Sequence, residues 1–291
     1  MTVFQRLFLL LLPCLVGSAA SAQLLLDVSS FRNDDVAVKG GVVELYVTVS
    51  GQHLVYHRRG PKMFQAGATV TLEAIRPDGA AVYQEVITLK PPVLRDTTAV
   101  IKNPISFQKR IVLPDGRYTM RAQMRDLYRA ASTVILEQPL AVNFGSDKLA
   151  LSNVVLLASP ASRAAIAANN FIRNGLTLTR TPAGLYARGQ DKLFFYAELY
   201  HATPGQPLVL RYYLRTLQGK QDVVIGKGLA QGGDGKPTVL TGELDLSKVP
   251  TGDYRLMVEV RNTKNQLIAS QTATLRRDPT EYAPAGAVMS R

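Results

Sequence analysis

The sequence has 291 residues, of which 46% are hydrophobic, and a formal net charge of +12. This length suits two domains better than one, and the apolar content is sufficient for two cores. Dedicated nucleic-acid binders concentrate positive charge on one face or tail, whereas here no basic run is longer than a pair. We therefore expect no nucleic-acid partner, and attraction to an anionic polysaccharide of the cell envelope stays open.

Residues 1–22 predict a cleaved signal peptide. Arg6 precedes a ten-residue apolar stretch, and Ala20-Ser21-Ala22 follows as a cleavage site. Ten apolar residues cross about half of a bilayer core, so we expect no transmembrane segment in the mature chain. The one cysteine, Cys14, lies inside the signal, and the preceding Pro13 disfavours lipidation there. The expected location is the periplasm or the cell surface, with outer-membrane association possible, and the mature chain has no thiol chemistry.

The first half of the mature chain consists of segments in which apolar and polar residues alternate. Residues 43–49 and 70–75 have this period of two, which is typical of half-buried strands. Residues 81–90 follow the second segment after Pro77-Asp78-Gly79, which predicts a tight hairpin. Asp34-Asp35, the one adjacent acidic pair, is interpreted as a turn between strands.

A motif occurs twice, as LPDGRYTMRAQMRD from Leu113 and as VPTGDYRLMVEVRN from Val249. Each copy has a turn, then Gly-x-Tyr, then an alternating strand. This order is typical of a late strand in an immunoglobulin-like sandwich, where the tyrosine hydroxyl bonds back to the preceding corner. The predicted structural corners are formed by Gly116, Tyr118, Gly252 and Tyr254.

The second half repeats the strand pattern at 192–201, 207–217, 237–246 and 265–277, and a short alanine-rich helix is expected at 159–169. We predict an all-β protein with two tandem immunoglobulin-like or fibronectin-like β-sandwich domains. The expected domains are residues 23–146 and 147–277, followed by a disordered tail at 278–291.

Several segments resemble the amino-terminal part of the GWxTD-domain proteins, a family of exported bacterial proteins. They are SSFRNDDVAVKGGVVELYVTVS in the first half and LALSNVVLLASP, NNFIRNGLTLTRTPAGLY and KLFFYAELYHA in the second. The sequence has no tryptophan, so it lacks the Gly-Trp-x-Thr-Asp element. The resemblance implies tandem sandwiches and export; because the family has no settled enzymatic activity, the resemblance informs location and architecture more than function.

The sequence contains no strong catalytic or metal-binding pattern. His53 and His57 are four residues apart in extended chain, a separation of about 13 Å that is too long for one zinc ion. No Gly-x-Ser-x-Gly occurs, and the glycine-rich segment 226–238 lacks the spacing and the helix of a phosphate-binding loop. We expect no catalytic, cofactor or metal residues, although an unrecognised pair of carboxylates would escape this search.

Two groups of side chains form the candidate interaction face. Tyrosines of the second half are expected to alternate outward as an exposed aromatic patch, and arginines of the first repeat form a basic face. The leading interpretation is a non-catalytic envelope scaffold or protein-interaction module. The alternatives are a carbohydrate-binding or adhesion module, a hydrolase, and a carboxy-terminal sorting domain. The candidate residues are Arg117, Arg121, Arg125, Tyr196, Tyr200 and Tyr213.

Overall fold

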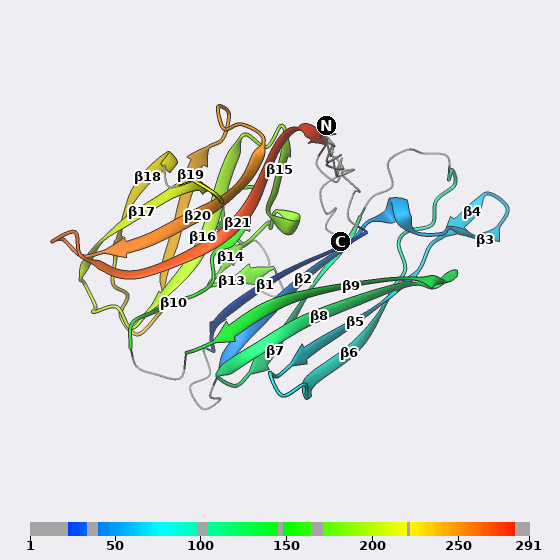
Figure 1. Cartoon of the computed structure of the whole chain (residues 1–291), viewed down its shortest axis with the longest axis horizontal. Helices are drawn as coiled ribbons and strands as arrows, with labels where there is room; N and C mark the ends of the chain where they lie inside the picture. The colour runs from blue at the N-terminus through cyan, green and yellow to red at the C-terminus, as the bar shows by residue number, and fades with distance from the viewer. Residues whose placement is uncertain are drawn as a thin grey trace, which may run out of the picture.

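The computed structural model describes residues 23–33, 40–97, 104–144, 148–164, 171–219 and 222–282. The predicted signal peptide, the Asp34-Asp35 turn and the residues beyond 282 lie outside these ranges. Nearly all the regular structure is β-strand, and the two halves of the chain lie side by side (Figure 1). The predicted all-β sandwich fold is confirmed. No helix in the described ranges is long and apolar enough to cross a membrane.

The first half is a sandwich of two antiparallel sheets. One sheet has the order β1-β2-β7 and the other β6-β5-β8-β9. Side chains from both sheets, including Leu45, Leu72 and Met120, are fully buried in a common core. Burial of each such side chain contributes roughly 1.5–3 kcal/mol. The strands are β1 (Leu24–Arg32), β2 (Gly41–Val49), β5 (Ala68–Ile75), β6 (Ala81–Leu89), β7 (Ile105–Leu113), β8 (Gly116–Asp126) and β9 (Arg129–Val142).

The second half repeats this plan around its own core. In one sheet β16 pairs with β19 on one side and with β10 and β11 on the other, and the second sheet has the order β15-β21-β20-β17-β18. The strand β15 runs parallel to β21. The strands are β10 (Ala150–Leu151), β11 (Val155–Leu157), β15 (Leu185–Arg188), β16 (Lys192–Tyr200), β17 (Pro207–Thr216), β18 (Asp222–Gln231), β19 (Thr238–Asp245), β20 (Gly252–Arg261) and β21 (Leu267–Tyr282).

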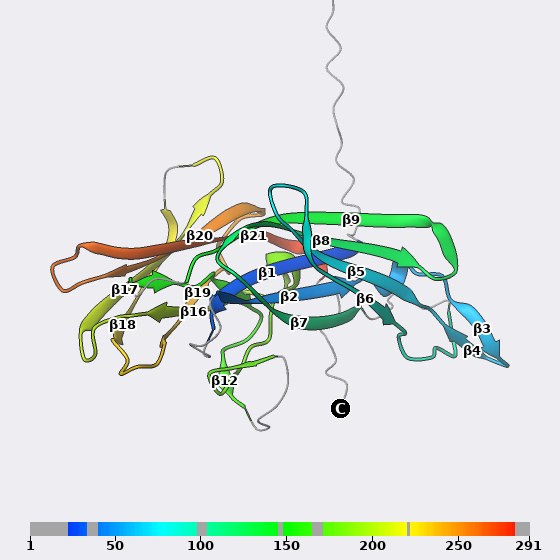
Figure 2. The ribbon, with the colours of Figure 1, turned by 90° about the horizontal axis from the view of Figure 1, so that it is seen from below.

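The two sandwiches share one strand order and differ in their insertions. In both, when β10 and β11 are counted as one strand and β15 as an added edge strand, the first, second and fifth sandwich strands form one sheet, and the third, fourth, sixth and seventh form the other. The first half inserts η1 (Gly51–His53), β3 (His57–Gly60) and β4 (Met63–Gln65), and this hairpin projects from the end of the molecule (Figures 1 and 2). The second half inserts β12 (Ser162–Arg163), β13 (Ile172–Arg173), β14 (Leu176–Thr177) and η2 (Pro182–Gly184).

The repeated motif forms the same corner in each half. The Tyr118 hydroxyl donates a hydrogen bond of 2.9 Å to the Pro114 carbonyl, and the Tyr254 hydroxyl donates one of 2.9 Å to the Pro250 carbonyl. A Cβ atom on Gly116 would lie 3.3 Å from the Tyr118 hydroxyl, so the ring packs directly over this glycine. Each corner begins the sixth sandwich strand, as predicted from the turn that is followed by Gly-x-Tyr.

The predicted hairpin is present, and two local predictions need correction. Gly79 has φ of 86° in the turn between β5 and β6, a conformation that glycine adopts easily. The helix expected at 159–169 is wrong where the structure describes it, because Ser162–Arg163 pairs with β14 as a strand. The last strand is longer than predicted, because the strand that we ended at residue 277 continues as β21 through Tyr282.

Candidate functional site

The predicted aromatic patch is not a patch on the surface. Tyr196, Tyr200 and Tyr213 do point away from the core of the second sandwich, but only 0%, 2% and 4% of their surface is exposed. Tyr196 and Tyr200 lie under the first half, where Phe31 and Phe144 contact their rings at centroid distances of 6.4 and 5.6 Å. The expectation that they are exposed is therefore wrong, because the outer face of their sheet is covered by the other half.

Tyr213 is covered in a different way. Its ring lies beneath two arginines of its own strand, with the guanidinium carbons of Arg211 and Arg215 at 4.9 and 5.1 Å from the ring centroid. Its hydroxyl donates to Glu259 on β20 at 2.8 Å. Long charged side chains of its own strand thus help to bury this tyrosine.

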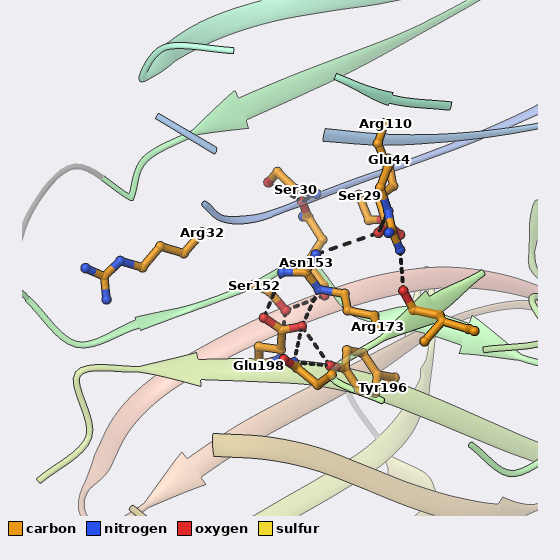
Figure 3. A network of polar contacts seen from close by, with 12 residues as sticks. Ser29, Ser30, Arg32, Glu44, Arg110, Ser152, Asn153, Arg173, Tyr196 and Glu198 are labelled. Carbon is orange, nitrogen blue, oxygen red and sulfur yellow. Dashed lines mark hydrogen bonds and ion pairs between the residues drawn. The ribbon is translucent and has the colours of Figure 1, made fainter. Parts of the chain in front are cut away.

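The junction between the halves is the main polar site of the molecule (Figure 3). It forms between the outer face of the β1-β2-β7 sheet and the outer face of β16, with the β13–β14 insertion between them. The strands β2 and β16 are therefore buried on both faces over most of their length. A small apolar cluster of Phe31, Val155, Leu157, Leu178 and Tyr196 joins residues from both halves beside the polar contacts.

Glu198 is the acceptor on the second half of the junction. Its side chain is fully buried, and its carboxylate accepts hydrogen bonds from Tyr196 at 2.7 Å and from Tyr200 at 2.5 Å. The Asn174 amide donates to it at 2.9 Å, and Arg173 makes a bidentate contact with both oxygens. This number of donors offsets the cost of removing the charge from water.

Glu44 is the corresponding acceptor on the first half, on β2. Arg110 Nε contacts one carboxylate oxygen at 2.8 Å, and a terminal nitrogen of Arg180 contacts the other at 2.6 Å. Arg110 also donates to the Ile172 carbonyl at 2.7 Å, and Arg180 to the Ser29 hydroxyl at 2.9 Å. Both arginines therefore connect the first half to the insertion of the second.

Arg173 joins the two acceptors. Its contact with Glu198 is supplemented by an ion pair of 3.7 Å with Glu44, and its guanidinium carbon lies 3.8 Å from the centre of the Phe31 ring. Burial by itself would lower the pKa of Arg173, but the hydrogen bond and charge of Glu198 hold that pKa above its usual value. Burial together with the charge of Glu198 also raises the pKa of both tyrosine hydroxyls, which stay protonated donors.

This pair of buried carboxylates bears on the hydrolase alternative. A hydrolytic pair needs one carboxyl group that can give up a proton and access for a substrate. Glu44 and Glu198 are 1% and 0% exposed, and both are engaged by arginines. Their arrangement is that of a structural ion network.

The sequence does contain a local signal for this site. In each of the two strands a glutamate interrupts an otherwise apolar and aromatic segment, at Glu44 in VVELYVTV and at Glu198 in LFFYAELY. A lone acid between aromatic residues on an outward face indicates a covered face with a cationic partner. The partners Arg173 and Arg180 carry no comparable signal, because Arg173 lies in a strand of two residues and Arg180 in an isolated β-bridge.

The predicted basic face is partly neutralised. Arg117, Arg121 and Arg125 share one face of β8, as the period predicts, and Arg117 and Arg125 are exposed. The central Arg121, however, contacts Glu137 on β9 at 2.6 Å and Glu73 on β5 at 3.4 Å. The face is therefore one of mixed charge.

The histidines do not meet in the structure. His53 lies in η1 and contacts the Ser50 hydroxyl at 3.1 Å, whereas His57 in β3 stacks on Tyr128 at 5.1 Å. Among the described residues no three His, Cys, Asp or Glu side chains gather as metal ligands. The glycine-rich segment 226–238 begins in β18 and ends at β19, with a loop at 232–237 between them.

Two clefts open beside the junction, with volumes of about 760 and 460 Å³. The smaller one contains Asp27 and Arg180. The Asp27 carboxylate accepts a hydrogen bond of 2.8 Å from the Ala183 N–H. Burial raises the pKa of Asp27 to about 6, although this hydrogen bond and the charge of Arg180 act in the opposite direction.

Comparisons with known proteins found no matching family model and no matching curated protein. Among solved structures, red sea bream transglutaminase is 10% identical with a TM-score of 0.26, and the match covers 88% of this chain but 31% of that one. The BSP domain of a biofilm-associated protein is 7% identical with a TM-score of 0.25, covering 88% and 52%. CBD12 from CALX1.2 is 10% identical with a TM-score of 0.20, covering 77% and 76%. These distant likenesses carry no argument about function.

Proposed function

We propose that this chain is a non-catalytic protein of the cell envelope, in which two sandwiches form one scaffold that binds a protein partner. The observation that carries the proposal is the junction, where two acids and two arginines are buried between the halves and a third, half-buried arginine, Arg110, contacts Glu44. Separating the halves would leave Arg180 without Glu44 and Ser29, its partners on the first half, so we expect the halves to act as one body. The signal-like residues 1–22 support export.

The junction also decides which surface is left for a partner. It covers the outer faces of the three-stranded sheet and of β16, whereas β18 remains an edge strand with one paired neighbour. Three apolar side chains alternate outward on β18, with Val223 41%, Ile225 53% and Leu229 88% exposed. An unpaired edge with outward apolar residues can take up an extended segment of another protein as an additional strand.

The test is a photo-crosslinking experiment in cells. A photoreactive phenylalanine replaces Leu229, and a matched protein carries it at Lys264, which is also exposed but lies in the β20–β21 turn. We expect a discrete crosslinked envelope protein from position 229 that is absent from position 264 and is lost when Ile225→Asp is added. Equal crosslinking from both positions, or none from either, would contradict the proposal.

Export is measured separately from binding. The proposal expects the protein to be recovered in the periplasmic or membrane fraction with Gln23 as its first residue. A cytoplasmic protein that retains residues 1–22 would refute the envelope location.

A further inference from the structure

The larger cleft, of about 760 Å³, lies at one end of the junction and is built from both halves. Arg32 comes from the end of β1, Asn174 from the β13–β14 turn, and His201 from the end of β16. Lys236 comes from the loop between β18 and β19. Its volume falls within the range of small-molecule binding sites, roughly 300–1,000 Å³.

The described lining of the cleft carries positive charge. Among the described residues that line it are the cations Arg32 and Lys236 but no aspartate or glutamate. Within the described ranges neither cation forms an ion pair, whereas every arginine of the neighbouring junction network does. The Arg32 side chain also extends away from that network (Figure 3). Both cations are therefore available to an anion in the cleft.

The floor of the cleft is held by the junction. The Arg32 N–H donates to the Tyr200 hydroxyl at 3.0 Å, and this hydroxyl donates to Glu198. The Asn174 side chain is held by Tyr196 at 2.7 Å and by Glu198. Because the contact with Tyr200 uses the Arg32 N–H, it fixes the backbone of Arg32 and does not involve the guanidinium. Such positioning before a ligand arrives lowers the entropy cost of binding.

The opposite wall is fixed by close contacts of its loop. The Gly232 N–H donates to the Gln206 carbonyl at 3.0 Å, and the Gly233 N–H donates to the Thr238 hydroxyl at 2.9 Å. A Cβ atom on Gly232 would lie 2.0 Å from the Thr203 carbonyl oxygen, so only glycine allows this approach. The glycine-rich segment therefore serves to bring Lys236 to the cleft.

His201 adds a second observation at the same place. It has φ of 55°, in the left-handed region, which costs a non-glycine residue of order 1–3 kcal/mol. Its Nε2 atom is buried and makes no hydrogen bond to the described protein. Strained residues and unpaired polar atoms of this kind cluster at ligand sites.

We propose that this cleft binds an oxyanion group carried by a sugar-sized molecule. A carboxylate, sulfate or phosphate fits the planar fork of Arg32, with Lys236 as a second charge. The apolar wall atoms of Ala202, Pro204 and Val239 suit the body of a small organic ligand better than a bare ion. This cleft is separate from β18, so the test of anion binding is independent of the test for a protein partner at β18.

The test uses calorimetric titration of the full mature chain with four probes: digalacturonate, glucose 6-phosphate, neutral cellobiose and inorganic phosphate. We expect the two charged sugars to bind, each weakening severalfold between low and physiological salt. A preference for the carboxylate or the phosphate sugar identifies the source of the anion, and either preference supports the site. Cellobiose binding as tightly as digalacturonate would overturn the proposal, as would inorganic phosphate binding as tightly as either charged sugar.

Matched variants assign the binding to the cleft. Arg32→Gln and Lys236→Gln should each weaken binding about tenfold or more, and neither disturbs the main-chain contact with Tyr200. Arg58→Gln and Lys264→Gln remove the same charges from exposed positions in β3 and in the β20–β21 turn, and should leave affinity within about twofold. Equal losses from the cleft variants and their controls would show a general charge effect and sink the proposal.

Discussion

In the second sandwich, the outward-facing tyrosines of β16 and of β17 are buried in two different ways. On β16, Tyr196 and Tyr200 are buried because the first half of the chain lies over them and because their hydroxyls bind Glu198. On β17, Tyr213 is buried by arginines of its own strand, and its hydroxyl donates a hydrogen bond to Glu259 on the adjacent strand β20. A side chain that points away from the core of its own sandwich can therefore be buried in a second contact region. We expect the contribution to the free energy of unfolding to differ between the tyrosines under the first half and Tyr213.

The largest expected effect comes from removing the acid under the first half. Glu198→Ala leaves Arg173 without its bidentate partner in a buried site, so we expect the free energy of unfolding to fall by about 3–5 kcal/mol. Chemical denaturation measures this. Glu243→Ala on the neighbouring strand β19, which breaks the exposed ion pair with Lys192, is the control and should leave the denaturation midpoint unchanged. Equal losses of stability from Glu198→Ala and Glu243→Ala would contradict the expectation that the buried acid of the junction contributes more than the exposed acid.

The comparison between the tyrosines is tested directly by two matched changes. Tyr196→Phe removes a donor to a buried carboxylate, and we expect a loss of about 2 kcal/mol. Tyr213→Phe removes a donor to Glu259, which Arg261 also contacts at 2.9 Å, so we expect a loss of about 0.5–1 kcal/mol. Denaturation curves of both variants give the two values, and a larger loss from Tyr213→Phe would reverse our interpretation.

Asp27, on the outer face of β1, should make the stability of the protein depend on pH. Because its pKa is raised from 3.8 to about 6, the folded protein keeps this proton at pH values where the unfolded chain has lost it. This contribution to stability is therefore present below pH 3.8 and is lost as the pH rises through about 6.

Asp27→Asn keeps an oxygen for the Ala183 N–H and removes the charge. We expect it to raise stability at pH 7.5 by about 1.5 kcal/mol, a value discounted for the partial exposure of the side chain. Near pH 4 we expect no change. Denaturation across this pH range checks both, and parallel profiles for the variant and the parent protein would contradict the assignment.

Small effects are also expected at the two corners, where the halves are alike. Tyr118→Phe and Tyr254→Phe each remove one hydrogen bond of 2.9 Å to a carbonyl. We expect each to lower the free energy of unfolding by about 1 kcal/mol. Thermal or chemical denaturation of the two variants measures this, and a difference of several kcal/mol between them would indicate that the corners are not equivalent.

The local sequence determined the strands that alternate clearly, the hairpin turn and both corners of this protein, whereas β7, β9 and β18 were not predicted from it. These features depend on the period of two, on glycine at a positive φ and on a tyrosine close to its own turn, all of which act over a few residues. The same period also placed Tyr196, Tyr200 and Tyr213 on outward faces.

Only the tertiary structure decided what covers those faces. Alternation tells which way a side chain points, but the covering residues Phe31 and Arg173 are far from Tyr196 and Glu198 in the chain, and no local pattern connects them. The cleft depends on the same long-range arrangement, because Arg32 and Lys236 line one cleft only after the two sandwiches have packed together.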